Sequence, residues 1–149
     1  MKIALIGYGK MGKAIHEIAL QKNIDVALIV DIENRNSVTK EELQQVDVAI
    51  EFTSPHTAVE NIKWCFDADV PVVVGSTGWT TQLDDIKKYA IENNKAFLFA
   101  PNFSIGVNIF FEVNRYLAKI MNEHEEYDIN LEEIHHTEKK DAPSGTALH

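Results

Sequence analysis

The stretch Lys2-Ile3-Ala4-Leu5-Ile6-Gly7-Tyr8-Gly9-Lys10-Met11-Gly12 decides the fold of this chain. Residues 2–6 form a short, mostly apolar run that predicts a strand, and the glycines of the stretch follow it directly. Apolar residues then recur with helical spacing, at Ala14, Ile15, Ile18 and Ala19. A strand, a glycine turn and a helix in this order are typical of the first unit of an open α/β sheet.

The same alternation continues along the chain. Further strands are expected at residues 25–30, 46–52, 70–74 and 95–100, and helices at 39–45, 55–68, 80–94 and 104–122. At the second helix Thr39 is the expected N-cap, with Glu42 in the capping-box position. Successive β-α-β units imply parallel strands, and strands that are apolar almost throughout imply helices on both faces. The expected fold is therefore α/β, a doubly wound parallel Rossmann-type sheet.

The last part of the chain has a different pattern. Residues 123–128 form an acidic hinge, and residues 127–135 alternate in part like a strand with one solvated face. We expect two domains, residues 1–123 and the beginning of a smaller mixed α+β domain at residues 124–149. Because the second domain has too few elements to bury its apolar residues, we expect the chain to be the N-terminal portion of a longer protein.

Charge and cysteine content exclude several classes of protein. The formal net charge of −9 argues against nucleic acid and anionic membranes as partners, because both require a basic surface. The single cysteine, Cys65, lies in an expected helix between Trp64 and Phe66, which suits a buried thiol in a reducing compartment. With no secretory signal and no apolar run of membrane-spanning length, a cytoplasmic location is expected.

The glycine motif has the sequence context of a dinucleotide-binding loop. Gly7 permits a tight turn, Gly9 lets the backbone approach a pyrophosphate, and Gly12 allows the helix to pack closely on the strand. Amides at the helix N-terminus can then bind phosphate. Asp31, about twenty positions further on, ends the second strand and can accept hydrogen bonds from an adenosine ribose. Alternatively, Asp31 only terminates that strand.

The preference between NADH and NADPH is left open by two cations. Lys10 and Arg35 could accommodate the 2′-phosphate of NADPH, or either could be a solvated surface charge. We therefore expect NADH or NADPH as the cofactor.

Two later loops are expected near the same edge of the sheet. Gly75-Ser76-Thr77-Gly78 and Pro101-Asn102-Phe103-Ser104 follow the fourth and fifth strands, where small residues and free amides could receive a nicotinamide ring. Alternatively, both are ordinary turns in which Thr77 and Ser104 only cap helices. Phe52-Thr53-Ser54-Pro55, after the third strand, is a similar but weaker candidate.

Proton donors and an anion cradle come together near the end of the sequence. His135 and His136 precede Lys139, and Pro143-Ser144-Gly145-Thr146 forms a turn with free amides. Neighbouring side chains of a strand point to opposite faces, so the two histidines cannot share one metal ion, and no metal site is expected. Glu138 and Lys140 fit a solvated, charged turn.

These motifs resemble the 4-hydroxy-tetrahydrodipicolinate reductase (dihydrodipicolinate reductase) family of bacterial lysine and diaminopimelate biosynthesis. The signature is similar to Glu133-Ile134-His135-His136, followed by Lys139 and by Asp141-Ala142-Pro143-Ser144-Gly145-Thr146-Ala147. Shorter matches are Glu51-Phe52-Thr53, Gly75-Ser76-Thr77-Gly78 and Asn102-Phe103-Ser104-Ile105-Gly106-Val107-Asn108. Many members have one more residue between the first two glycines than this chain has.

The resemblance implies roles for individual residues. His135 would be the proton donor or acceptor and Lys139 a second proton donor, while His136 and the amides of Gly145 and Thr146 would bind a small cyclic dicarboxylate. The residues implied in cofactor binding are Gly7, Tyr8, Gly9, Lys10, Met11, Gly12, Asp31, Gly75, Ser76, Thr77, Ala100, Pro101, Asn102 and Phe103. The implied reaction removes water from 4-hydroxy-tetrahydrodipicolinate and reduces the ring with NADH or NADPH to tetrahydrodipicolinate, in a full-length protein that forms a homotetramer.

Two other functions fit parts of the sequence. A nucleotide-binding regulatory module would use the glycine loop without chemistry at the histidines, and a fragment of the reductase could bind nucleotide yet be inactive because its substrate domain is incomplete. A semialdehyde dehydrogenase is disfavoured, because Cys65 lies in the middle of a helix and not at an exposed nucleophile position.

Overall fold

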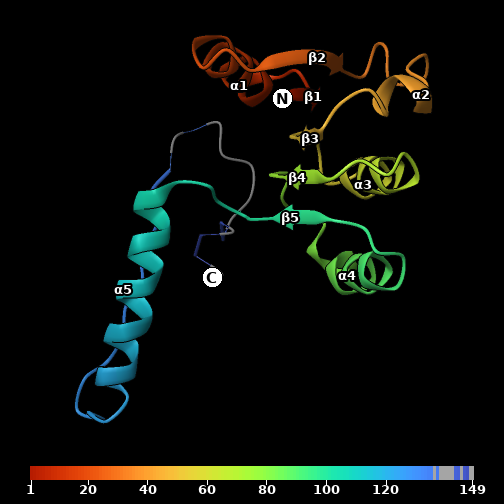
Figure 1. Cartoon of the computed structure of the whole chain (residues 1–149). Helices are drawn as coiled ribbons and strands as arrows, with labels where there is room; N and C mark the ends of the chain where they lie inside the picture. Colours follow the sequence, from red (N-terminus) through yellow and green to blue (C-terminus); the bar gives the residue numbers. More distant parts are fainter. Residues whose placement is uncertain (136, 138–142, 145, 148–149) are drawn as a thin grey trace. The chain divides into compact units, whose positions relative to one another are not determined.

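The structure is a computed structural model that describes residues 1–135, 137, 143–144 and 146–147. Its elements alternate as the sequence predicts, although most are shorter at their ends and the helix expected at residues 80–94 begins with a 3-10 turn, η1. In chain order they are β1 (Lys2–Ile6), α1 (Lys10–Gln21), β2 (Asp25–Val30), α2 (Lys40–Leu43), β3 (Val48–Glu51), α3 (Ala58–Asp67), β4 (Val72–Val74), η1 (Thr80–Gln82), α4 (Leu83–Glu92), β5 (Phe97–Phe99) and α5 (Ile105–Met121) (Figure 1).

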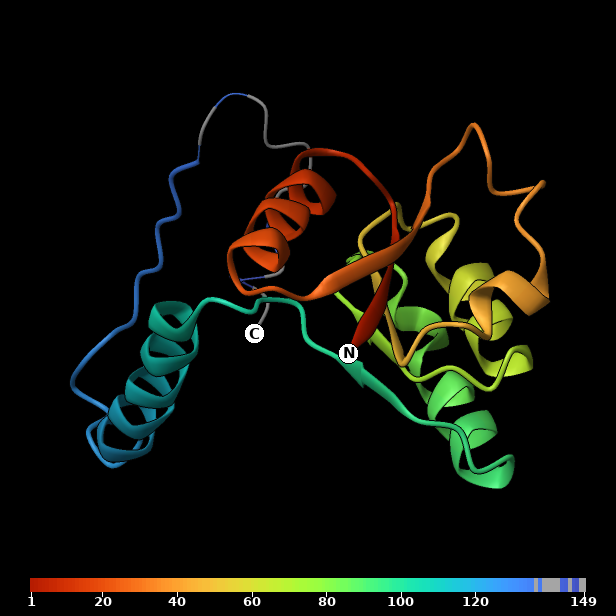
Figure 2. The ribbon, with the colours of Figure 1, turned by 45° about the horizontal axis from the view of Figure 1, so that its top comes forward.

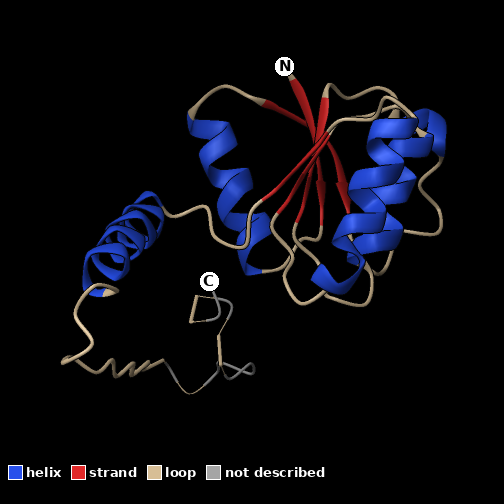
Figure 3. Cartoon of the chain, turned by 90° about the horizontal axis from the view of Figure 1, so that it is seen from below, coloured by secondary structure: helices blue, strands red, loops and turns tan. Residues whose placement is uncertain are grey.

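All five strands of the sheet are parallel, in the order β2-β1-β3-β4-β5. Helices lie on both faces of the sheet, with α1 on one side and α2, α3 and α4 on the other (Figure 3). This arrangement confirms the doubly wound α/β prediction. Because the chain crosses from one face to the other after β2, the connections of β1 and β3 leave the sheet in opposite directions, which opens a crevice at their carboxyl ends.

Each face of the sheet has its own apolar core. The larger core packs α3 and α4 against the sheet and includes Phe66, Trp79 and Ile86, each at most 2% exposed. The smaller one packs Ala19 of α1 against Ile3 and Leu5 of β1. With both faces covered, strand side chains are apolar on both sides, which explains why periodicity of two is weak in this part of the sequence.

Local signals fix several helix ends. Thr39 Oγ1 accepts from the backbone N of Glu42 at 3.2 Å, and Glu42 Oε2 accepts from the backbone N of Thr39 at 2.7 Å, so the predicted capping box is confirmed. Helices α1, α3 and α4 are followed by left-handed residues, Asn23, Asp69 and Asn94, with φ of 54°, 60° and 52°. Asn and Asp tolerate this conformation better than other side chains, so they can terminate a helix much as glycine does.

The chain divides into two compact units, Met1–Ala100 and Pro101–His149. The sheet and its four helices make up the first unit, and α5 belongs to the second. The division lies at the start of α5, whereas the sequence prediction puts the domain boundary at its end. Within the described residues, no helix is long and apolar enough to cross a membrane.

The strand predicted at residues 127–135 is not formed. The structure describes all of these residues, and they are neither helix nor strand. Ile129, Leu131 and Ile134 are exposed, at 78%, 65% and 84%. A strand needs a neighbour for its backbone N–H and C=O groups, and none of the described residues in the second unit supplies one. The alternating pattern could not reveal that missing partner, so this prediction is wrong.

Candidate functional site

A cavity of about 520 Å³ lies in the first unit, at the carboxyl ends of β1, β2 and β3. It is at the crevice where connections diverge, the usual ligand position in open α/β sheets. Its lining residues are Ile6, Gly7, Tyr8, Gly9, Val30, Asp31, Ile32, Arg35, Asn36, Phe52, Thr53, Ser54, Thr57, Glu60 and Asn61.

The glycine loop forms one wall of this cavity, and each glycine meets a different constraint. Gly7 has a φ of +95°, and a Cβ there would overlap the carbonyl oxygen of Phe52. A Cβ on Gly12 would overlap the carbonyl oxygen of Gly7, whereas one on Gly9 would meet nothing within 4 Å. Gly7 and Gly12 are therefore required by the fold itself. Gly9 borders open space in front of the first turn of α1, whose amides have no partners within the helix.

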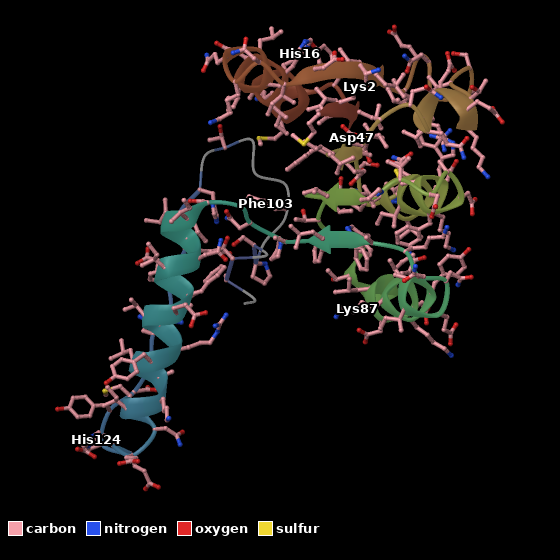
Figure 4. All side chains as sticks on the ribbon, in the orientation of Figure 1. Lys2, His16, Asp47, Lys87, Phe103 and His124 are labelled. Atoms are coloured by element: carbon pink, nitrogen blue, oxygen red, sulfur yellow. The ribbon has the colours of Figure 1, made fainter. Side chains whose placement is uncertain are left out.

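Not all side chains of the glycine loop line the cavity. Tyr8 lines the cavity, and its hydroxyl shares a hydrogen bond of 2.6 Å with Nδ1 of His16, which lies on α1 (Figure 4). Lys10 and Met11 are exposed residues in the first turn of α1 and are not among the lining residues. The amides of this turn, more than its side chains, are thus the groups available to an anion.

The loop that leads from β2 to α2 is drawn in orange in Figure 2. Asp31 and Arg35 lie in this loop, and both line the cavity. Asp31 Oδ1 accepts from the backbone N of Ile32 at 2.8 Å. The Arg35 guanidinium carbon lies 3.8 Å from the centre of the Trp64 ring, and Nε donates to Asn61 Oδ1 at 3.1 Å. With its side chain only 23% exposed, Arg35 is a fixed cation in the wall and not a solvated surface charge.

The loop after β3 contributes more to the cavity than the sequence indicates. Phe52, Thr53 and Ser54 line it, although this loop is the weakest of the predicted loop candidates. Behind them lies Glu51, which is fully buried. Burial raises the pKa of the Glu51 carboxyl above its usual value, and hydrogen bonds from Thr53 and Ser76 oppose this shift.

The predicted loop after β4 has a different position. Ser76 is 6% exposed and donates to Glu51 Oε1 at 3.0 Å, and its carbonyl oxygen accepts from Trp79 Nε1 at 2.7 Å. Gly75 is half-buried and Thr77 is exposed. None of these three predicted residues lines the cavity.

The predicted loop after β5 spans the division between the two units. Ala100 is the last residue of the first unit, and Pro101, Asn102 and Phe103 belong to the second. Asn102 Oδ1 accepts from the backbone N of Ser104 at 2.8 Å. Ser104 in turn caps α5 by accepting from the backbone N of Val107, as the turn interpretation of this loop predicts.

The second unit brings two parts of the C-terminal motif together. Glu133 Oε2 lies 2.9 Å from His135 Nε2, and Glu133 Oε1 accepts from the backbone N of Ser144 at 2.9 Å. Ser144 is 1% exposed, and its hydroxyl oxygen accepts from the backbone N of Ala147 at 3.1 Å. The hydrogen bonds from Ser144 and then His135 lower the pKa of Glu133 to about 2, so this carboxylate is ionised at neutral pH.

Several predicted site residues cannot be placed. His136, Lys139 and Gly145 lie outside the described residues. Thr146 is described and exposed. The described residues contain no group of three His, Cys, Asp or Glu side chains that could hold a metal ion.

The sequence alone predicts no role for three residues of these sites. Glu133 precedes His135 by two positions, which puts both side chains on the same side of an extended chain, and this spacing could have identified it. Glu51 ends an apolar strand, a position where a carboxylate is unusual. Asn61 gives no signal, because its partners Arg35 and Thr53 are distant in the sequence.

The fold and the cavity define a Rossmann-type α/β protein with its ligand crevice at the switch point of the sheet. Comparison of the sequence with models of protein families agrees with this class of protein and narrows it to one family. The model for the N-terminus of dihydrodipicolinate reductase matches residues 1–103, and the model for its C-terminus matches residues 106–149. The chain belongs to the dihydrodipicolinate reductase family.

Individual relatives support the same family. The 4-hydroxy-tetrahydrodipicolinate reductase of Christiangramia forsetii is 45% identical over 152 residues, covering 99% of this chain and 61% of that protein. The enzyme of the same name from Methanocaldococcus jannaschii is 46% identical over 117 residues, covering 74% of this chain and 42% of that protein. A dipicolinate-bound dihydrodipicolinate reductase from Paenisporosarcina sp. TG-14 superposes with a TM-score of 0.70 at 29% identity, over 99% of this chain and 63% of that one. The chain therefore spans less than two thirds of the length of these relatives.

Proposed function

We propose that the protein carrying this chain is an NAD(P)H-dependent oxidoreductase that reduces 4-hydroxy-tetrahydrodipicolinate to tetrahydrodipicolinate in lysine and diaminopimelate biosynthesis. Residues 1–123 form its dinucleotide-binding domain, and residues 124–149 begin its substrate-binding domain. The nicotinamide cofactor supplies hydride to the substrate ring. The chain's own residues bind the cofactor, hold the dicarboxylate and move protons.

The cavity at the switch point supports the cofactor assignment. Its volume of about 520 Å³ suits one part of a dinucleotide, and Gly9 leaves open space next to the amides of the first turn of α1. Asp31 can accept from ribose hydroxyls, while the fixed Arg35 guanidinium can pair with a 2′-phosphate. With both groups in one wall, either NADH or NADPH can be bound. The remaining cofactor contacts are assigned to Gly75, Ser76 and Thr77 and to residues 100–103.

The arrangement around Glu133 supports the substrate assignment. One carboxylate joins His135 to the turn at Ser144, so the proposed proton donor lies next to the proposed anion cradle. Glu133 Oε2 lies 2.9 Å from His135 Nε2 and holds the imidazole in place, so that His135 can donate a proton as hydride adds to the ring. Lys139 is the second proton donor, and His136, Gly145 and Thr146 bind the carboxylates. The dipicolinate-bound relative favours a substrate of this class.

The proposed setting follows from family and composition. We assign the full-length protein to the cytoplasm, where the buried thiol of Cys65 stays reduced, and to a homotetramer without nucleic acid or membrane partners. Size-exclusion chromatography with light scattering tests the tetramer.

The observation that carries the proposed function is the Glu133 link between His135 and Ser144. The proposed function is tested by replacing His135 or Lys139 with Ala in the purified protein. Turnover should fall by at least about a hundredfold, the usual worth of acid–base catalysis, while the Kd for NADH stays within twofold. His124→Ala, at an exposed histidine in the same unit, is the matched control and should leave turnover unchanged. Near-normal turnover in both test variants contradicts the assignment, and binding of NADH without any turnover in the unsubstituted protein favours a regulatory module.

A further inference from the structure

The carboxyl group of Glu51 is a buried acceptor directly behind the cavity. Its Oε1 accepts from the backbone N of Thr53 at 3.1 Å, from Ser76 Oγ at 3.0 Å, and from Thr53 Oγ1. Within the part of the chain that the structure describes, Oε2 has no hydrogen-bond partner. Burying such a group costs free energy that an apolar side chain would not, so its place at the end of an apolar strand points to a role beyond packing.

A chain of hydrogen bonds leads from Glu51 to the cation in the cavity wall. The Thr53 hydroxyl has one proton, which it donates to Glu51, so its oxygen can only accept from Asn61 Nδ2, 3.3 Å away. The Asn61 amide is thereby oriented with Oδ1 toward Arg35, whose Nε donates to it at 3.1 Å. Each hydrogen bond in this series is donated in the direction of Glu51, whose carboxylate is the last acceptor.

The same reasoning extends to two hydroxyls that line the cavity. Thr57 Oγ1 lies 2.9 Å from Thr53 Oγ1 and 2.9 Å from Ser54 Oγ. Because the Thr53 proton is given to Glu51, Thr57 donates to Thr53, and Ser54 in turn donates to Thr57. Glu51 therefore sets the direction of the hydrogen bonds along the cavity lining.

The orientation of the Arg35 guanidinium depends on this hydrogen-bond chain more than on the other contacts of Arg35. Stacking on Trp64 fixes the plane of the guanidinium but leaves it free to turn within that plane. The Glu60 side chain is 76% exposed, and its Oε1 lies 3.9 Å from Arg35 Nη2, so this ion pair constrains the guanidinium weakly. The hydrogen bond from Nε to Asn61 is the contact that fixes which N–H groups remain for a ligand.

We propose that Glu51 is a positioning residue for cofactor recognition, which acts through Thr53 and Asn61 to orient the Arg35 guanidinium toward the 2′-phosphate of NADPH. The inference rests on the proposed binding of a nicotinamide dinucleotide in this cavity. Because NADH lacks the 2′-phosphate, the effect of Glu51 is specific to NADPH.

Calorimetric Kd values for NADPH and NADH test this inference in the purified protein. Thr53 is exposed, and Thr53→Val keeps the shape of its side chain but removes the hydroxyl that links Glu51 to Asn61. The Kd for NADPH should rise about fivefold, which is the worth of one hydrogen bond, and the Kd for NADH should change by less than twofold. Glu51→Leu, which removes the terminal acceptor, should shift the two Kd values in the same selective way, whereas Glu51→Gln keeps an acceptor oxygen at Oε1 and should leave both Kd values within twofold. In an Arg35→Ala background Thr53→Val should leave the Kd for NADPH within twofold, because coupled residues are non-additive. Thr80→Val and Glu92→Gln, at exposed sites on η1 and α4, are matched controls that should change neither Kd.

The possible failures of the two proposals are distinct. If the unsubstituted protein binds neither NADPH nor NADH, the proposed function is overturned, and this inference with it. If the unsubstituted protein binds both cofactors, two results overturn only the positioning role of Glu51. Either Thr53→Val raises the Kd values for NADPH and NADH equally, or it raises the Kd for NADPH as much in the Arg35→Ala background as in the unsubstituted protein. Since Thr53 is exposed, the Thr53→Val variant decides the question even if Glu51→Leu does not fold.

Discussion

The fold requires a glycine at position 7 but not at position 9. Replacing each glycine with Ala therefore separates an effect on folding from an effect on cofactor binding. Gly9 has a φ of −77°, which any residue adopts, and a Cβ there would meet no atom within 4 Å. The free energy of unfolding should therefore change by at most about 0.5 kcal/mol in Gly9→Ala, as for surface substitutions. Gly7 has a φ of +95° and abuts the backbone of Phe52.

The magnitudes for Gly7→Ala add to a large effect. The strained backbone costs about 1–3 kcal/mol, and displacing the Phe52 backbone costs about 1–3 kcal/mol more. The expected loss of about 2–6 kcal/mol is a large part of the total stability of roughly 5–15 kcal/mol typical of a domain. Urea denaturation followed by tryptophan fluorescence measures this loss directly.

Binding should show the reverse order of severity. The added methyl of Gly9→Ala occupies the space through which phosphate approaches the amides of α1. Loss of one charge-assisted hydrogen bond is worth about 1.5–3 kcal/mol, or roughly a 10- to 100-fold higher Kd for NADH. Calorimetry on the folded variant provides the assay. The reasoning is refuted if Gly9→Ala binds NADH with unchanged affinity, or if Gly7→Ala is as stable as the unsubstituted protein.

Three further predictions concern titratable groups. Burial raises the pKa of the Cys65 thiol to about 12, so a disulfide reagent at pH 8 should label it only after urea unfolds the protein, and rapid labelling of folded protein would contradict this. Burial raises the pKa of Glu51 above its ordinary value of about 4.5, so its contribution to stability is fully present below about pH 4.5 and is lost as the pH rises through the folded-state pKa. Relative to Glu51→Gln, the urea midpoint of the unsubstituted protein should therefore fall as the pH rises above about 4.5, and parallel pH profiles would refute this. Glu133 has the opposite sign: its stabilising contacts are fully present above about pH 4.5 and should be lost as the pH falls through about 2. The Ser144 amide resonance should then titrate near pH 2 in the unsubstituted protein and not in Glu133→Gln, and a midpoint near 4.5 would be inconsistent with the observed contacts.

Local signals in the sequence were sufficient to predict the sheet. Apolar runs, the glycine turn and the capping box of Thr39 and Glu42 all depend on neighbours within a few residues, and each is confirmed. The cavity could be anticipated at Gly7, Gly9 and Asp31, because the motif that contains them encodes its own strand-turn-helix context.

Features that depend on distant partners could not be predicted in this way. The acceptor role of Glu51 needs Ser76, which is 25 positions away, and the orientation of Arg35 needs Asn61, which is 26 positions away. The strand expected at residues 127–135 failed for the same reason, because its formation depends on a neighbour that its own alternation does not encode. The hydrogen bond that the Ser76 hydroxyl donates to Glu51 likewise has no signal in the sequence around Ser76.

The most direct test of the proposed function is turnover by the purified protein with freshly generated 4-hydroxy-tetrahydrodipicolinate and NADPH, followed by the loss of reduced-nicotinamide absorbance. We expect oxidation of NADPH that requires both protein and substrate and that dipicolinate inhibits by competing with the substrate. Bound NADPH that is never oxidised in the presence of this substrate would contradict the proposed reductase activity.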